Sequence, residues 1–137
     1  MDSILETLLI GLPVLVAQFG VALALLGIGI ACYMALTPFH ELRLVREGNL
    51  AGGIVLTGAV VALAIPLAAT LATSAVTLDI LLWGLVAVAL QLLAFLATAA
   101  LFRGLRQMIE AGNAAAACVV AGIQLAVALV NAGAMAG

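Results

Sequence analysis

The stretch FHELRLVREGN, residues Phe39 to Asn49, returns later in the chain as FRGLRQMIEAGN, residues Phe102 to Asn113. Both copies place an Arg and a Glu four residues apart and end in Gly-Asn, and both interrupt an apolar chain. Of the 137 residues, 68% are hydrophobic and 7% are charged, whereas a soluble domain carries about 25% charged residues. The two copies are therefore predicted to be polar connections between segments that lie in lipid.

Uncharged stretches flank the two copies, and each is long enough to cross a bilayer once. A helix needs about 20 apolar residues to cross a hydrocarbon core of about 30 Å. The runs are continuous in Ala and Leu, which argues against a spanning barrel with alternating apolar and polar residues. The sequence predicts an all-α, polytopic membrane protein with four transmembrane helices, at about 8–36, 50–73, 79–101 and 114–135. The acidic start and long apolar run of the first stretch indicate a retained span and not a cleaved signal.

The charges predict an orientation for these helices. All four arginines, and His40, lie in the two connections. The charged residues predicted on the opposite side of the membrane are all acidic: Asp2, Glu6 and Asp79. Because Arg and Lys are retained on the cytoplasmic side, both Arg-bearing loops are expected to be cytoplasmic and both termini to face outward. We therefore expect a multi-pass protein of a bacterial inner membrane.

The repeated phrase extends into a longer internal match. With Phe39 aligned on Phe102, Arg43 meets Arg106 and Glu47 meets Glu110; one residue inserted after Glu110 then aligns the Gly-Asn pairs and the mid-span glycines. This predicts a tandem repeat of two-helix units, residues 1–73 and 74–137. Each unit crosses twice, so the copies should be related by a pseudo-two-fold axis along the membrane normal, as in parallel transporter repeats.

The phrase has two interpretations. In the first it ends one helix and starts the next: the Arg–Glu spacing allows pairing on a helix, Gly permits a left-handed helix end, and Asn is a strong N-cap. In the second, side chains of both copies converge at a cytoplasmic mouth that docks a partner. The adjacent His40 and Glu41 are interpreted as an interfacial pair. The candidate docking residues are His40, Glu41, Arg43, Glu47, Asn49, Arg106, Glu110 and Asn113.

Inside the spans, polar and small residues are the features to explain. Gln124 and Asn131 share a face of the last span and either line a polar path or, more commonly, form interhelical hydrogen bonds. Pro66 bends its helix and serves as a hinge or as a passive kink. The intramembrane polar or hinge candidates are Pro66, Gln91, Gln124 and Asn131. The pairs Gly58–Ala62 and Gly122–Ala126 are predicted to bring the second and fourth spans together at the centre of the bundle.

Several function classes find no support in the sequence. No ionisable residue falls in the middle of a predicted span, which argues against a proton relay. Cys32 and Cys118 are expected to act as small hydrophobic residues. We expect no enzymatic activity, no metal and no cofactor, and the absence of a basic face argues against nucleic-acid binding. The expected environment is the lipid bilayer, with a homo-oligomer or a membrane or cytoplasmic protein as partner.

Two stretches resemble a known family: ALTPFHELRLVREGNLAGGIVLTGAVVALAIPLAA, residues 35–69, and IEAGNAAAACVVAGIQLAVALVNAGAM, residues 109–135. Together they are similar to the YjfL-like bacterial inner-membrane proteins, domain of unknown function 350. The residues that carry the pattern are Thr37, Pro38, Glu41, Gly48, Asn49, Ala51, Gly58, Pro66 and Leu67, then Asn113, Ala114, Ala115, Gly122 and Asn131. The resemblance implies four helices in paired units and a setting in envelope stress, beside proteins related to PspA. It implies no activity.

Two functional hypotheses follow. The first is a non-enzymatic membrane subunit or adaptor whose cytoplasmic hairpins bind a partner, because the sequence offers no extramembrane domain. The alternative is a homo-oligomeric channel or small transporter, which the internal repeat and the polar face of the last span favour. A continuous polar path beside Gln124 and Asn131, or a dry seam there, distinguishes them.

Overall fold

The computed structural model describes residues 1–37 and 39–137, so Pro38 of the family pattern lies outside the described residues. In chain order the helices are α1 (Asp2–Leu36), α2 (Glu41–Arg46), α3 (Leu50–Thr73), α4 (Thr77–Leu101), α5 (Leu105–Glu110) and α6 (Ala114–Ala136). The protein is all-helical. The described residues include four helices that are long and apolar enough to cross a membrane, namely α1, α3, α4 and α6.

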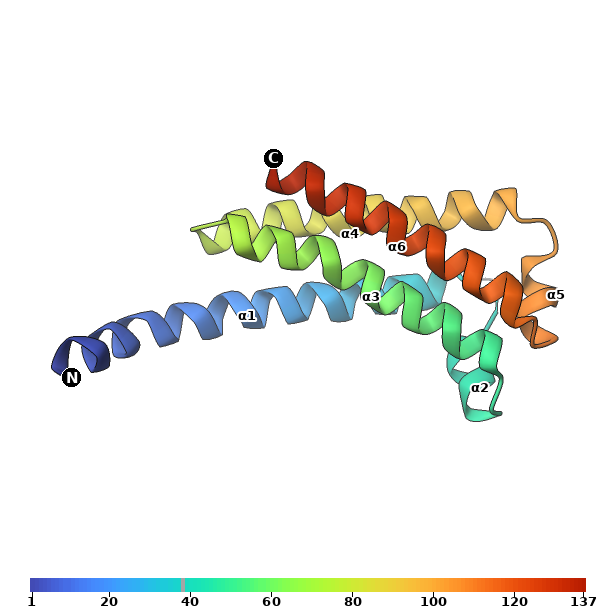
Figure 1. The fold of residues 1–137 in the computed structure, drawn as a ribbon, viewed down its shortest axis with the longest axis horizontal. Coiled ribbons are helices and arrows are strands. Elements are labelled where there is room, and N and C mark those ends of the chain that lie inside the picture. The colour runs from blue at the N-terminus through green and yellow to red at the C-terminus, as the bar shows by residue number, and fades with distance from the viewer. Residues whose placement is uncertain (38) are drawn as a thin grey trace.

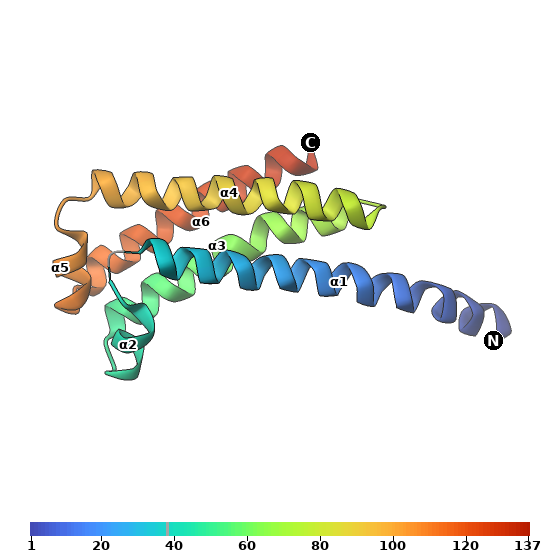
Figure 2. The same ribbon diagram turned by 180° about the vertical axis from the view of Figure 1, so that it is seen from behind.

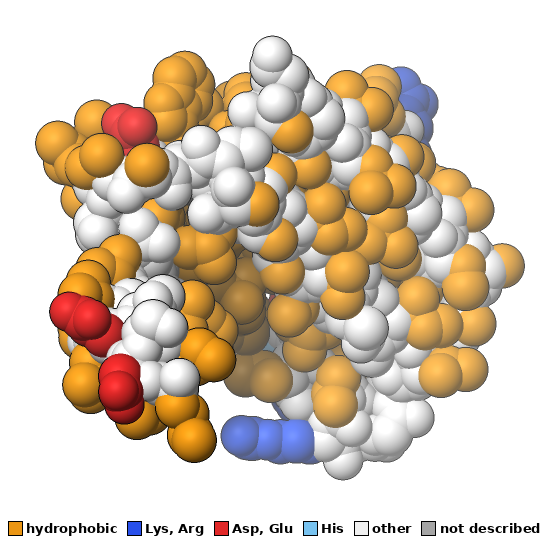
Figure 3. Space-filling view, turned by 60° about the vertical axis from the view of Figure 1, so that its left-hand side comes forward, with side chains coloured by type: hydrophobic (Ala, Val, Ile, Leu, Met, Phe, Trp, Pro, Cys, Tyr) orange, Lys and Arg blue, Asp and Glu red, His pale blue; other side chains and the backbone are white. Residues whose placement is uncertain are grey.

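The two short helices lie at the same end of the molecule (Figures 1 and 2). We call this the hairpin end; the opposite end, with the α3–α4 turn and the C-terminus, is the turn end. Helices α1 and α4 run to the hairpin end, and α3 and α6 return from it. Hydrophobic side chains cover most of the face in Figure 3, as expected for a surface in lipid.

Helix α1 is longer than its predicted span. It begins at Asp2 and not at residue 8, because an acidic residue in the first turn is favourable at a helix N-terminus and does not end the helix. Gln18 Nε2 donates to Ala75 O at 3.4 Å, which places Gln18 level with the α3–α4 turn. Residues 18–36 rise about 28 Å, close to a hydrocarbon core of about 30 Å. The first half of α1 therefore extends past the bundle (Figures 1 and 2).

The centre of the bundle is the contact between α3 and α6, the most extensive between any two helices. A Cβ added at Gly58 would lie 2.6 Å from Ala121 Cβ and 2.9 Å from Ala121 Cα, so the two backbones touch there. Ala62, one turn along α3, is fully buried. In lipid, where apolar surface gains nothing by leaving the solvent, such close packing holds helices together. The expected central pair is thus confirmed.

The predicted roles of Gly122 and Ala126 in this contact are wrong. Both residues are exposed, and a Cβ at Gly122 would meet nothing within 4 Å. The buried positions of α6 are instead Ala116, Ala117, Val120, Ala121, Gln124, Ala128 and Asn131, which recur at helical spacing along one face. Each residue turns a helix by about 100°, so the alignment that paired Gly58 with Gly122 was one residue away from the packing face.

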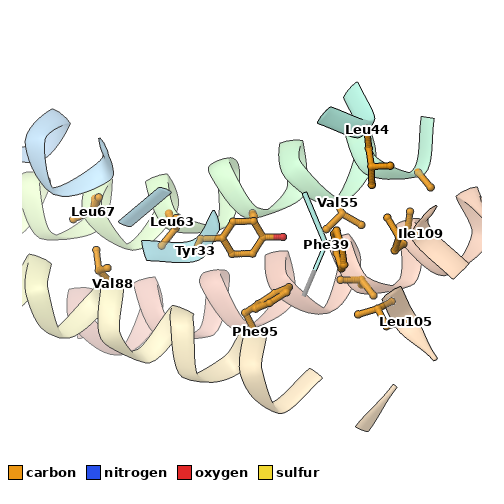
Figure 4. Close-up of a cluster of buried hydrophobic side chains, with 14 of the residues drawn as sticks. Tyr33, Phe39, Leu44, Val55, Leu63, Leu67, Val88, Phe95, Leu105 and Ile109 are labelled. Atoms are coloured by element: carbon orange, nitrogen blue, oxygen red, sulfur yellow. The ribbon is translucent and has the colours of Figure 1, made fainter. Parts of the chain in front are cut away.

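Helices α1 and α4 cover one side of this pair. A Cβ at Gly84 of α4 would lie 2.5 Å from Leu25 Cδ1 of α1, so Gly84 admits that leucine. Toward the hairpin end, Tyr33 of α1 packs edge-on against Phe95 of α4, with ring centroids 4.6 Å apart. Figure 4 shows the Tyr33 hydroxyl directed toward Phe39 within the buried cluster. Large buried side chains of the core therefore lie where the short helices close the bundle.

Gly58, which faces α6, and Gly122, which faces away from α3, provide a matched test of the packing. We expect Gly58→Leu to destabilise the protein strongly, because overpacking costs about 1–3 kcal/mol even where neighbours can relax and here the neighbour is backbone. Gly122→Leu should unfold at the wild-type temperature in detergent, since its side chain points away from α3. Thermal unfolding of both variants is the measurement. Equal melting of the two variants would contradict the assigned α3–α6 face.

Candidate functional site

The hairpin end is built by two matching helix terminations. Gly48 and Gly112 adopt left-handed φ values of +79° and +82°, which glycine reaches without a Cβ penalty. In each copy, two backbone amides that follow the short helix donate hydrogen bonds to carbonyl oxygens of its last turn, as in a Schellman motif. The bonds are Gly48 N to Val45 O (3.0 Å), Asn49 N to Leu44 O (2.8 Å), Gly112 N to Ile109 O (3.0 Å) and Asn113 N to Met108 O (2.9 Å).

The asparagines then start the next spans, as predicted. Asn49 Oδ1 accepts from Gly52 N at 3.0 Å, and Asn113 Oδ1 accepts from Ala116 N at 3.1 Å. The Arg–Glu pairs also form, with Arg43 Nε 3.7 Å and Arg106 Nε 3.1 Å from the glutamate Oε1 four residues on. The arginines are about 60% exposed, and exposed pairs of this kind contribute about 0.3–0.5 kcal/mol.

The predicted alignment of the two copies is wrong by one residue within the short helices. Counted back from Gly48 and Gly112, Arg106 corresponds to Leu42 and not to Arg43, and Leu105 corresponds to Glu41. The extra residue of the second copy lies before α5, where Gly104 has a φ of +73°, and not after Glu110. Glycine adopts this left-handed backbone without a steric penalty, which lets the longer connection turn into α5. The Arg–Glu pairs therefore occupy different positions on their helices.

Asn49 also joins the two hairpins. Its Nδ2 donates to Ile109 O at 3.0 Å and to Glu110 O at 3.2 Å, 60 and 61 residues away. Carbonyls in the last turn of a helix have no partner within it, so Asn49 supplies donors that α5 needs. Among the described residues, Asn113 makes only its own cap. The structure thus joins the two hairpins through Asn49, and among the docking candidates it brings Asn49 of the first copy into contact with Glu110 of the second.

Glu41 is the largest departure from the sequence interpretation. It is only 1% exposed, whereas His40 beside it is exposed, because neighbouring residues on a helix point about 100° apart. The two are therefore no interfacial pair, and Glu41 does not belong to the exposed docking candidates. Helix α2 folds under the bundle and carries this carboxyl into the interior, where the sequence predicted no ionisable group.

The surroundings of Glu41 favour its protonated form. Thr37 Oγ1 lies 3.1 Å from Glu41 Oε2 and 3.0 Å from the carbonyl oxygens of Tyr33 and Met34, but a hydroxyl has one hydrogen to donate. Glu41 Oε1 and the Tyr33 hydroxyl are buried without a hydrogen-bond partner among the described residues. A neutral carboxyl can donate to Thr37 and leave the threonine hydrogen for a carbonyl.

Burial accordingly raises the pKa of Glu41 above its ordinary value and outweighs the nearby hydroxyls of Tyr33 and Thr37 and the charge of His40, which lower the pKa. Tyr33, Thr37 and Glu41 recur at intervals of four residues, and this spacing is the signal in the sequence that could have identified the cluster. It was missed because the break between α1 and α2 made the spacing look incidental.

A second polar cluster lies between α4 and α6. Gln91 Nε2 donates to Gln124 O and to Gln124 Oε1, both at 3.0 Å, and Asn131 Nδ2 donates to Ala87 O at 3.4 Å. All three side chains are buried. Gln91 Oε1 and Gln124 Nε2 have no partner in the described part of the chain. Gln91 and Gln124 thus close the contact, or seam, between α4 and α6 in the single chain, by bonding to each other.

Pro66 lies buried inside the continuous helix α3, and its carbonyl accepts a hydrogen bond from Thr70 Oγ1 at 3.0 Å. Its role as a hinge stays a prediction. No group of His, Cys, Asp and Glu that could hold a metal occurs among residues 1–37 and 39–137.

Comparison with known proteins places the chain among membrane proteins. The family model described as Domain of Unknown Function (DUF350) matches residues 7–135. The UPF0719 inner membrane proteins YjfL of Escherichia coli K12 and of E. coli O157:H7 are each 28% identical to the chain over 119 residues, which cover 87% of this chain and 90% of the relative. No solved structure matches. The names of these relatives state a location and no activity.

The buried carboxyl predicts a pH dependence of stability. Since the folded state raises the pKa of Glu41, it binds more protons than the unfolded state above the ordinary glutamate range, and stability falls as pH rises through the raised pKa. Glu41→Gln keeps the shape and removes the charge, so we expect it to stabilise the protein by about 1–3 kcal/mol at alkaline pH and to flatten this dependence. Unfolding across pH measures both. A variant that keeps the wild-type slope would contradict a buried, titrating Glu41.

The asparagines predict unequal effects of the same substitution. Asn113→Ala removes one N-cap and should cost about 1 kcal/mol. Asn49→Ala also leaves Glu110 O without its donor and Ile109 O with Gly112 N alone, so its cost should reach about 2–3 kcal/mol. Denaturant or thermal unfolding of the two variants in the same detergent measures the difference. If both lose the same stability, the link from Asn49 to α5 contributes nothing.

Proposed function

The chain belongs to the DUF350 family, and we propose that it is a non-enzymatic membrane subunit that docks a partner protein at its hairpin end. It is an integral membrane protein with four helices able to span the bilayer, and its named relatives are inner membrane proteins. The proposal concerns what such a protein does there.

The observation that carries the proposal is the link from Asn49 to the end of α5. It makes one surface of the two hairpins, so their exposed charged side chains can contact one partner together. That surface holds all the arginines of the chain: Arg43, Arg46, Arg103 and Arg106. Arg43 and Arg106 are paired with Glu47 and Glu110, which among the described residues leaves Arg46 and Arg103 to favour a partner with an acidic face, because charge complementarity speeds and directs association.

The closed seam between α4 and α6 also supports a role without permeation. Gln91 donates a hydrogen bond to Gln124 midway along α4 and α6. In a pore, these side chains would instead face water. By the distribution of Arg and Lys in membrane proteins, the hairpin end is cytoplasmic and the termini are outside. The partner is then cytoplasmic or membrane-bound, and the resemblance suggests envelope stress as the setting.

A homo-oligomeric channel or small transporter is the second candidate. It is favoured by the unpartnered Gln91 Oε1 and Gln124 Nε2 atoms, which a rearranged seam could turn toward a path. The first half of α1, whose apolar side chains are exposed, would be available for contact with a second copy. Ion flux into liposomes that contain the purified protein is the test of this candidate.

The docking surface is tested by Arg43→Ala, Arg106→Ala and the double variant. After cross-linking in native membranes, each single change should reduce recovery of the co-purifying partner, and the double change should be non-additive, because residues that share a partner couple. Glu6→Gln, at the opposite end of the molecule, is the matched control and should leave recovery unchanged. Normal recovery with the double variant, at normal folded yield, would reduce the repeated phrase to helix capping.

A further inference from the structure

A groove at the turn end, far from the hairpins, is not used by the docking surface. It lies between the ends of α3, α4 and α6 and has a volume of about 620 Å³, within the usual range of about 300–1,000 Å³ for ligand sites. Its walls include Thr73 of α3, Ser74 of the α3–α4 turn, Asp79, Trp83 and Leu90 of α4, and Asn131 of α6.

The walls change from polar to apolar along α4. Asp79 lies in the first turn of α4, next to the α3–α4 turn that carries Ser74. Trp83 follows one turn further in, and Leu90 two turns beyond that. From Asp79 to Leu90 the helix rises about 16 Å, about half of a hydrocarbon core of about 30 Å. The groove thus has a polar mouth at the membrane surface and an apolar wall that extends to the depth of one leaflet.

The groove is open toward the lipid. The side chains of Trp83 and Leu90 are 56% and 46% exposed although both line it. A lipid molecule can therefore enter sideways without leaving the bilayer, which a soluble ligand or a folded protein domain cannot do. Shape and position together indicate an amphiphile with its headgroup at the mouth and an acyl chain along α4.

The charge of the mouth selects the headgroup. Within residues 1–37 and 39–137, Asp79 is the only charged side chain that lines the groove, so an anionic headgroup would meet repulsion. A primary ammonium can donate hydrogen bonds to the carboxylate and to the hydroxyls of Thr73 and Ser74, and charge-assisted bonds of this kind are strong. The indole of Trp83 adds a face that attracts cations. We propose that the groove binds a phospholipid with a primary ammonium headgroup, an ethanolamine phospholipid.

The test uses the full-length protein, delipidated in detergent, and native mass spectrometry with added phosphatidylethanolamine or phosphatidylglycerol of identical acyl chains. The wild type should bind the ethanolamine lipid about fivefold more tightly, as expected for one partly exposed ion pair. Asp79→Asn should abolish this preference, and Trp83→Leu should weaken binding of the ethanolamine lipid. Glu6→Gln removes a carboxylate outside the groove and should leave the preference intact.

Several results would overturn the proposal. Equal binding of the two lipids by the wild type, or an unchanged preference in Asp79→Asn, would remove the assigned headgroup contact. Free ethanolamine that raises the melting temperature as much as the lipid does would replace the lipid by a soluble amine. If Asp79→Asn folds poorly, Trp83→Leu gives an independent test: a variant that melts normally and binds the ethanolamine lipid as tightly as the wild type contradicts the site.

Discussion

The close contact of α3 and α6 at Gly58 and Ala121 is the constraint on which the rest of the structure depends. The backbones can approach this closely only where a glycine faces a small residue, so the contact favours the one register that sets Gly58 against Ala121. The register then places the N-terminus of α3 beside the end of α5. Only in this arrangement can the side chain of Asn49 cap its own helix and also reach Ile109 and Glu110.

The hairpin end combines strong local terminations with one unfavourable burial. The glycine and asparagine pairs satisfy the backbone groups that two helix ends and two helix starts expose, which makes the connections short. Short connections hold α2 under the bundle, and this position buries Glu41. A buried carboxyl without a full set of partners destabilises the fold unless it is protonated. Such a group marks a place where protonation or a binding event can alter the structure, directly below the proposed docking surface.

The closed seam of Gln91 and Gln124 separates the two ends of the molecule. On one side lie the arginines and the buried Glu41; on the other lies the groove with Asp79 and Trp83. Polar side chains thus lie at both ends of the bundle and, between the ends, at the contact of Gln91 with Gln124. A path through the single chain would require the contact between Gln91 and Gln124 to rearrange.

The sequence by itself determined the features that depend on local spacing: the all-helical class, the four apolar helices, the helix ends at Gly48 and Gly112, the caps at Asn49 and Asn113, and the two Arg–Glu pairs. It also indicated which two spans pack at the centre, because their small residues were visible in the composition. Only the tertiary structure decided that Ala121 and not Gly122 faces Gly58, that the extra residue of the second copy lies before α5, that Glu41 turns inward, and that Asn49 reaches α5. Each of these depends on the rotation of one helix against another, and since one residue turns a helix by about 100°, only the packed neighbours select the face.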